Sequence, residues 1–145
     1  MNYMWLEKAI EIAIKAHRGQ EDKAGEAYIL HPLRVMLSQT TNVNRIVAVL
    51  HDVIEDAGIE YRQYIIDTGI DGCIIEALDC LTHNDGENYF DYIRRCKSND
   101  IAKIVKLADL SDNMNVTRIK HPTAKDFNRN MKYRQAMEIL LDIGE

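Results

Sequence analysis

The chain has 145 residues, of which 46% are hydrophobic and 28% are charged, a composition typical of a globular domain and unlike that of a disordered segment. Its formal net charge of −5 at pH 7 argues against a nucleic-acid-binding surface, because such surfaces carry an excess of Lys and Arg. No apolar run approaches the roughly 18 residues of a membrane-spanning helix. We therefore expect neither a nucleic acid nor a membrane among the partners.

The cysteines indicate the redox environment. Cys73, Cys80 and Cys96 are odd in number and form no CxxC pair, so neither a disulfide framework nor a thiolate zinc site is expected. Glu7 brings a charge too early in the chain for a secretory signal peptide. We interpret the sequence as that of a soluble, cytoplasmic protein.

The first half of the chain predicts helices joined by short loops. Apolar residues recur at helical spacing over residues 3–17, and the two glycines in residues 18–27 predict a loop. His31 is followed by proline, which favours the first position of a helix, so a helix is expected to begin there. The next helix is expected to have Asn42 or Asn44 as its N-cap and to continue until Gly58 ends it; those three residues are its expected limits.

The second half continues the helical pattern. The expected helices cover residues 61–68, 71–81, 89–96, 100–119 and 123–143. Asp71, Ser98 or Asn99, and Thr123 are their candidate N-caps, and Gly69 is expected to end the first of them. No segment alternates like a strand, so the sequence predicts an all-α fold with one domain spanning residues 1–145.

Four ionisable side chains interrupt the apolar segment of residues 48–56. They are His51, Asp52, Glu55 and Asp56. Residues four apart share a helix face, so a continuous helix would place His51 over Glu55 and Asp52 over Asp56. Isolated charges in an apolar segment are usually paired or bound to a metal ion. The adjacent His and Asp therefore predict a metal site, and the second pair predicts proton transfer beside it.

Two other segments supply further candidate ligands. His31 lies at the entry to a helix, and Asp109 interrupts the apolar residues 101–110. Together with His51 and Asp52, they offer two imidazoles and two carboxylates to one ion. Nitrogen and oxygen ligands without thiolate suit Mn²⁺, Fe²⁺ or another divalent first-row ion. Four protein ligands on an octahedral ion leave two positions for water and substrate, which is typical of a catalytic site.

The ordered set of His, His-Asp and Asp resembles the HD-domain metal-dependent phosphohydrolases, and a larger set of motifs resembles the hydrolase domain of the Rel/SpoT-type alarmone enzymes. The single-domain small alarmone hydrolases are the most similar in architecture. The motifs are His17-x-Gly-Gln-x-x-Lys23-x-Gly-x-x-Tyr28-x-x-His31-Pro32, His51-Asp52-x-x-Glu55-Asp56 and Lys106-Leu-Ala-Asp109-x-x-x-Asn113-Met. The resemblance implies an HD-domain helical bundle.

The resemblance also implies an activity and roles for individual residues. The activity is Mn²⁺-dependent removal of the 3′-pyrophosphate from guanosine tetra- or pentaphosphate, (p)ppGpp, in the stringent response. The implied roles are metal ligands at His31, His51, Asp52 and Asp109, a catalytic acidic pair at Glu55 and Asp56, and nucleotide contacts at Lys23, Tyr28 and Asn113. Lys23 and Lys106 are also expected to offset phosphate charge.

Two segments differ from the family pattern. Asp22 stands where the alarmone hydrolases usually have Arg before the loop lysine, and residues 110–116 replace the usual Arg-Leu-x-Asn-Met-Arg-Thr. Because these positions concern base recognition, two alternatives stay open. The chain could hydrolyse another phosphorylated nucleotide, or it could be a regulatory module that binds metal or nucleotide without turnover.

The remaining polar residues have simpler expectations. Asp112 is either a partner of a metal ligand or a solvated side chain. His17 is expected to be a hydrogen-bonded packing residue, and His83 to be solvated in a polar loop. A solvated face is expected for the basic side chains of the segment 118–129, with contact to a substrate phosphate as the alternative; these are Arg118, Lys120, Lys125 and Arg129.

Overall fold

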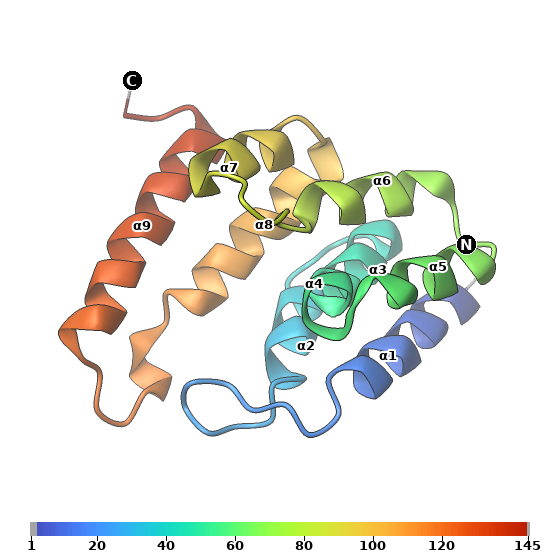
Figure 1. The fold of residues 1–145 in the computed structure, drawn as a ribbon, viewed down its shortest axis with the longest axis horizontal. Coiled ribbons are helices and arrows are strands. Elements are labelled where there is room, and N and C mark those ends of the chain that lie inside the picture. The colour runs from blue at the N-terminus through green and yellow to red at the C-terminus, as the bar shows by residue number, and fades with distance from the viewer. Residues whose placement is uncertain (1–2, 145) are drawn as a thin grey trace.

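The computed structural model describes residues 3–144, which form an all-α bundle as predicted (Figure 1). Within these residues the extended structure is limited to an isolated bridge between Glu21 and Ala27. The elements in chain order are α1 (Met4–Ala16), α2 (Leu30–Leu37), α3 (Asn42–Leu50), α4 (Val53–Ala57), α5 (Ile59–Asp67), α6 (Gly72–Leu81), α7 (Tyr89–Lys97), α8 (Asp100–Asn113), the 3₁₀ helix η1 (Val116–Arg118) and α9 (Ala124–Leu141).

Helix α3 lies at the centre of the bundle. It packs against α1, α2, α6 and α8, and the residues from Ile46 to Leu50 are all buried. This C-terminal half of α3 is apolar on every side, as is typical of a helical segment that neighbours cover completely. Figure 1 shows α1 and α5 on one side of this centre and α8 and α9 on the other. The segment that follows α3 is therefore held in the interior.

Large apolar side chains from several helices fill the core. Leu50, Ile65, Leu78, Ile93 and Leu110 are each at most 1% exposed. Burying one such side chain contributes roughly 1.5–3 kcal/mol. These residues come from α3, α5, α6, α7 and α8, so the core fixes most of the helices relative to one another.

The predicted continuous helix up to Gly58 is wrong, because His51 and Asp52 lie between α3 and α4. The Nδ1 atom of His51 lies 2.6 Å from the Ala48 carbonyl oxygen, which would accept from the Asp52 N–H in an uninterrupted helix. A side chain that inserts into the helical hydrogen-bond ladder bends or interrupts the helix. The predicted end at Gly58 is confirmed, with a φ of 114°.

The N-caps follow the expected chemistry with one exception. Thr41 caps α3 by accepting a hydrogen bond from the Asn44 N–H at 3.1 Å, so the prediction of Asn42 or Asn44 is wrong. Asp71 caps α6 and Asn99 caps α8, each through its side-chain oxygen at 2.9 Å. Ser, Thr, Asp and Asn side chains can all serve as N-caps. Where several of them are adjacent, the backbone geometry at the end of the loop determines which one caps the helix.

Helix α8 ends at Asn113, earlier than the predicted end near residue 119. The side chain of Asn115 accepts a hydrogen bond from the Thr117 N–H at 3.1 Å, a local bond that competes with helix continuation. Arg118 donates to the Asp112 carbonyl oxygen at 3.0 Å, which satisfies an acceptor at the helix end. The chain therefore turns back, and Arg118 lies beside the end of α8.

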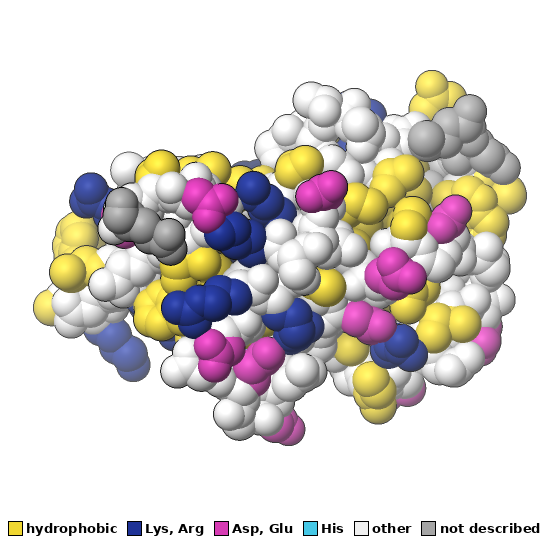
Figure 2. Space-filling view, turned by 90° about the horizontal axis from the view of Figure 1, so that it is seen from above, with side chains coloured by type: hydrophobic (Ala, Val, Ile, Leu, Met, Phe, Trp, Pro, Cys, Tyr) yellow, Lys and Arg dark blue, Asp and Glu magenta, His cyan; other side chains and the backbone are white. Residues whose placement is uncertain are grey.

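The surface carries charges of both signs. Figure 2 shows basic and acidic side chains next to one another on the face seen from above Figure 1. The basic side chains of α7 are paired with acidic ones: Arg94 with Asp91, Arg95 with Glu87, and Lys97 with Asp142. The positive charge of this helix is thus compensated locally. None of the helices in residues 3–144 combines the length and apolarity that crossing a bilayer would require.

Candidate metal centre and adjoining cavity

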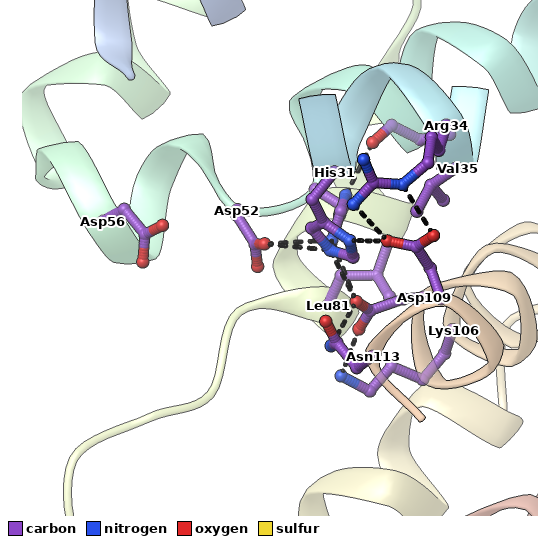
Figure 3. A network of polar contacts seen from close by, with 12 residues as sticks. His31, Arg34, Val35, Asp52, Asp56, Leu81, Lys106, Asp109 and Asn113 are labelled. Carbon is purple, nitrogen blue, oxygen red and sulfur yellow. Dashed lines mark hydrogen bonds and ion pairs between the residues drawn. The ribbon is translucent and has the colours of Figure 1, made fainter. Parts of the chain in front are cut away.

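The four side chains predicted as metal ligands lie together. His31, His51, Asp52 and Asp109 each offer one atom, and these atoms lie within 4.8 Å of one another. Figure 3 shows His31, Asp52 and Asp109 pointing toward one another. The two Nε2 atoms are 3.3 Å apart. The His51 Nε2 lies 3.0 Å from an Asp52 oxygen, and the His31 Nε2 lies 2.9 Å from an Asp109 oxygen. These donors converge from α2, the α3–α4 break and α8.

The donor set fits a divalent ion. Bonds of about 2.1 Å at right angles separate neighbouring ligand atoms by about 3 Å, close to the separations between these donors. Both imidazoles use Nδ1 elsewhere: His51 contacts the Ala48 carbonyl oxygen at 2.6 Å and His31 contacts Asp112 at 2.7 Å. With the proton on Nδ1, each Nε2 has a lone pair free for an ion.

Asp109 is a buried carboxylate with several partners. Lys106 donates to one of its oxygens at 2.7 Å, and Asn113 donates to the other at 3.0 Å. Burial opposes ionisation of Asp109, but the charge of Lys106, together with the charge and hydrogen bonds of the two histidines, outweighs it and holds the pKa of Asp109 well below its usual range. Lys106 therefore lines the cavity and at the same time forms an ion pair with a candidate ligand.

The predicted acidic pair lines the same cavity as the two carboxylates of the donor set. Glu55 and Asp56 line a space of about 230 Å³ together with Asp52 and Asp109. The backbone N–H of His83 donates to Glu55 at 2.9 Å. Burial raises the pKa of both Glu55 and Asp56, because a carboxylate loses solvation there. Two carboxyl groups with raised pKa values beside a metal centre are suited to accept protons near neutral pH.

A second cavity of about 330 Å³ adjoins the first. Tyr28, Asn113 and Tyr133 line both spaces, so the two are neighbours, and together they are called the recess below. Lys23 lines only the larger cavity, away from the metal donors. The Tyr28 hydroxyl donates to Asp52 and thus connects the wall of the recess to a candidate ligand.

The larger cavity lies where two loops meet. It is lined by residues of the loop after α1 and by residues of η1 and α9, which Figure 1 shows approaching each other at one end of the bundle. Arg118 and Arg129 add positive charge to Lys23 at this point. Their position at the cavity favours the alternative that they reach a substrate phosphate over that of a solvated face, and the clustered charge suits an anionic ligand.

Asp22 has a structural role in the first of these loops. Its carboxylate accepts hydrogen bonds from the backbone N–H groups of Ala24 at 2.8 Å and Glu26 at 3.0 Å. This is the local turn chemistry that Asp favours. Asp22, which stands where the family usually has Arg, thus stabilises the turn of the loop that carries Lys23.

The prediction made from the sequence is wrong for His83, and it assigned no role to Gln20. His83 is not a solvated side chain: its ring stacks on Tyr92 with centroids 4.7 Å apart, and it lines the smaller cavity. Gln20 donates to Asp56 at 3.0 Å and contacts the buried His17 at 2.9 Å, so the expected packing role of His17 is confirmed. The motif His17-x-Gly-Gln20 contained the signal for Gln20.

Comparison with known proteins gives sequence relatives for the chain. No family model matches it. It is 34% identical over 124 residues to the guanosine-3′,5′-bis(diphosphate) 3′-pyrophosphohydrolase of Borreliella burgdorferi, covering 74% of this chain and 18% of that protein. It is 28% identical over 135 residues to the protein of the same name from Vibrio cholerae, covering 83% of this chain and 19% of that protein.

A third relative has a different name. The chain is 25% identical over 154 aligned positions to a probable GTP pyrophosphokinase of Mycobacterium leprae, covering 99% of this chain and 19% of that protein. The chain therefore spans about a fifth of the length of these curated relatives. The resemblance to the hydrolase domain of the Rel/SpoT-type alarmone enzymes, which the spaced motifs predict, is confirmed by these sequence relatives.

Proposed function

We propose that residues 1–145 form an HD-type domain that hydrolyses guanosine 3′,5′-bis(diphosphate), or its pentaphosphate form, and releases the 3′-pyrophosphate. The observation that carries the proposal is the convergence of His31, His51, Asp52 and Asp109 beside the pair Glu55 and Asp56. The names of the relatives in Borreliella burgdorferi and Vibrio cholerae support the substrate.

His31, His51, Asp52 and Asp109 would hold a divalent ion, with Mn²⁺ as the proposed metal. When bound, such an ion supplies positive charge that stabilises the phosphoryl group under attack. The nitrogen and oxygen donors suit Mn²⁺. They do not suit Cu⁺, which prefers soft sulfur ligands. Lys106 neutralises part of the negative charge of Asp109, which limits repulsion between the carboxylates and the incoming phosphates.

Glu55 and Asp56 would handle the proton of the attacking water. Water adds to the phosphorus bonded to the ribose 3′ oxygen, and the bond between that oxygen and phosphorus breaks. One carboxylate takes the proton that the water loses, and a proton passes from the acidic pair to the released 3′ oxygen, so that the products are a 3′-hydroxyl and pyrophosphate. The His83 N–H holds Glu55, and the Gln20 amide holds Asp56. Carboxylates held in this way can act as general bases without first reorganising.

The recess beyond Tyr28 and Asn113 would hold the rest of the nucleotide. Lys23 lines its far part together with two arginines, so a phosphate away from the reacting one would find positive charge there. A nucleotide that carries phosphate groups at two positions matches a recess with a metal centre at one end and cationic side chains at the other.

The test is pyrophosphate release from guanosine tetraphosphate by the Mn²⁺-loaded protein. Release at a rate that depends on added Mn²⁺ is expected. A panel of nucleotides with 2′-, 3′- and 5′-phosphates distinguishes the first alternative, because a different phosphorylated nucleotide would then be turned over faster. Nucleotide binding without turnover of any member would favour a regulatory module, and it would contradict the proton-transfer role of Glu55 and Asp56.

A further inference from the structure

The carboxylate of Asp112 connects a candidate metal ligand to an arginine. The His31 Nδ1 atom lies 2.7 Å from one Asp112 oxygen. Arg34 donates from Nε to the other oxygen at 2.8 Å and from Nη2 to the first at 3.0 Å. The Asp112 side chain is 14% exposed, so this fork lies partly shielded from water between α2 and α8.

Asp112 does not line either part of the recess that holds the metal donors and Lys23. It lines a further space with Arg34 and Ser38, and this space shares a single lining residue, Asn115, with the larger cavity. Figure 3 shows Arg34 and Asp52 on opposite sides of His31. Asp112 therefore contacts His31 at Nδ1, on the side of the ring away from the ligand atom Nε2, and is not placed to touch a substrate.

The two histidines have different supports. His51 is held by a neutral acceptor, the Ala48 carbonyl oxygen at 2.6 Å, whereas His31 is held by a charged carboxylate at 2.7 Å. A partner at Nδ1 fixes the tautomer and ring orientation of a metal-binding imidazole, and a carboxylate also makes the imidazole more basic. The support of His31 is therefore the stronger of the two, and it depends on one side chain.

Arg34 determines where that carboxylate lies. A bidentate guanidinium fork holds both the position and the plane of a carboxylate. Arg118 approaches the same carboxylate at 3.4 Å and also donates to the Asp112 backbone carbonyl. The Asp112 side chain is therefore held by two guanidinium groups as well as by the contact with His31.

We propose that Asp112, held in place by Arg34, is a positioning residue that orients His31 for binding a divalent ion. This rests on the proposed function only in requiring that His31 be a metal ligand; it does not depend on which nucleotide is hydrolysed. The competing explanation is that Arg34 and Asp112 form a tie between α2 and α8 that contributes to stability alone.

The test measures Mn²⁺ affinity directly, by calorimetric titration or by competition with a chelator, on the full chain. Asp112→Asn keeps the shape of the side chain and removes its charge. The expected result is a 10- to 100-fold loss of Mn²⁺ affinity, the usual cost of removing a partner of a metal-binding histidine. Arg34→Gln should give a smaller loss in the same direction, and the losses in the double variant should not add, because both act through one contact.

A matched control exists elsewhere in the bundle. Arg62 donates to both oxygens of Asp79 at 2.8 Å between α5 and α6, and neither residue lines the recess. Asp79→Asn should leave Mn²⁺ affinity unchanged. Arg62→Gln provides the corresponding control for Arg34→Gln.

The outcomes separate this inference from the proposed function. Mn²⁺ affinity within twofold of the wild type in both Asp112→Asn and Arg34→Gln, measured on folded protein, would overturn the positioning role. Wild-type protein that binds Mn²⁺ but releases no pyrophosphate would contradict the proposed function while leaving the affinity comparison valid. If Asp112→Asn does not fold, Arg34→Gln alone decides, because an unchanged affinity there contradicts the role of the fork.

Discussion

At the residue scale, the ionisable groups of the α3–α4 segment divide between two tasks. His51 and Asp52 lie 3.3 Å and 3.7 Å from the candidate ligand atom of His31, whereas Glu55 and Asp56 are held by His83 and Gln20. The break after α3 makes this division possible, because it releases the first pair from the helix that carries the second. The two pairs should therefore respond differently to substitution.

Asp52→Ala should remove both metal binding and turnover. Its carboxylate is one of the four convergent donors, so the loss of Mn²⁺ affinity should exceed the roughly 10- to 100-fold cost of losing a supporting residue. Glu55→Gln should retain Mn²⁺ and lower kcat by roughly 100-fold or more, the usual contribution of a general base. Bound metal and pyrophosphate release measured on the same samples check both. An unchanged kcat in Glu55→Gln would show that Glu55 does not take the proton.

The pH dependence of kcat/KM should reflect the acidic pair. Burial raises the pKa of Glu55 and Asp56, and a general base acts only when it is deprotonated. Activity should therefore fall on the acid side at a higher pH than the usual carboxyl range of about 4 would give. A pH–rate profile at saturating Mn²⁺ measures this. A profile that is flat down to the usual carboxyl range would contradict it.

The same raised pKa values affect stability. A carboxyl group whose pKa is raised on folding contributes stability that is present at low pH and is lost as pH rises through the folded-state pKa. At neutral pH the ionised Glu55 should therefore destabilise the metal-free fold. Glu55→Gln, which retains an acceptor for the His83 N–H, should raise Tm at pH 7 and change it less at pH 4. A lower Tm at pH 7 would mean that the contacts of Glu55 outweigh its desolvation.

At the element scale, the end of α4 depends on one glycine. Gly58 has a φ of 114°, and a Cβ there would lie 2.7 Å from the Glu60 carboxylate. Conformations of this kind cost other residues about 1–3 kcal/mol. Gly58→Ala should therefore lower the free energy of unfolding by about that amount, measured by urea denaturation.

Gly72 provides the control for this prediction. It lies at the start of α6, its φ is not positive and a Cβ would contact nothing within 4 Å. Gly72→Ala should be neutral or stabilising by up to about 1 kcal/mol, because alanine reduces the conformational entropy of the unfolded chain. Equal effects at the two glycines would contradict the role of backbone conformation at Gly58.

At the scale of the whole molecule, metal binding should be coupled to folding. The donors come from segments far apart in the sequence, with His31 and Asp109 separated by 78 residues. An ion that binds only the folded chain stabilises it by about 2.7 kcal/mol at a free concentration of 100 times Kd. We expect Mn²⁺ to raise Tm by roughly 8 °C under that condition, and Asp52→Ala to abolish the shift. A Tm that is independent of Mn²⁺ would contradict metal binding at this site.

Much of the site was predictable from the sequence because its residues lie in recognisable local patterns. His31 adjoins a proline, although α2 begins at Leu30 and not at that proline; the His51-Asp52 pair interrupts an apolar run, and Asp109 interrupts the apolar residues 101–110. Apolar spacing likewise determined the all-α fold and most helix positions. These features depend on neighbours in the chain, so they could be derived from the sequence without knowing what lies across the bundle.

Only the tertiary structure decided the contacts between distant segments. The interruption of α3 depends on where the His51 ring points, and the partner of His31 is Asp112, 81 residues away. The ion pair between Lys106 and Asp109, and the presence of Arg118 and Lys23 in one cavity, also depend on packing. Hydrogen bonds require distances near 3 Å and defined angles. Residue spacing determines which side chains lie on the same face of one helix. Which faces of different helices come into contact is determined by the packing of the whole core.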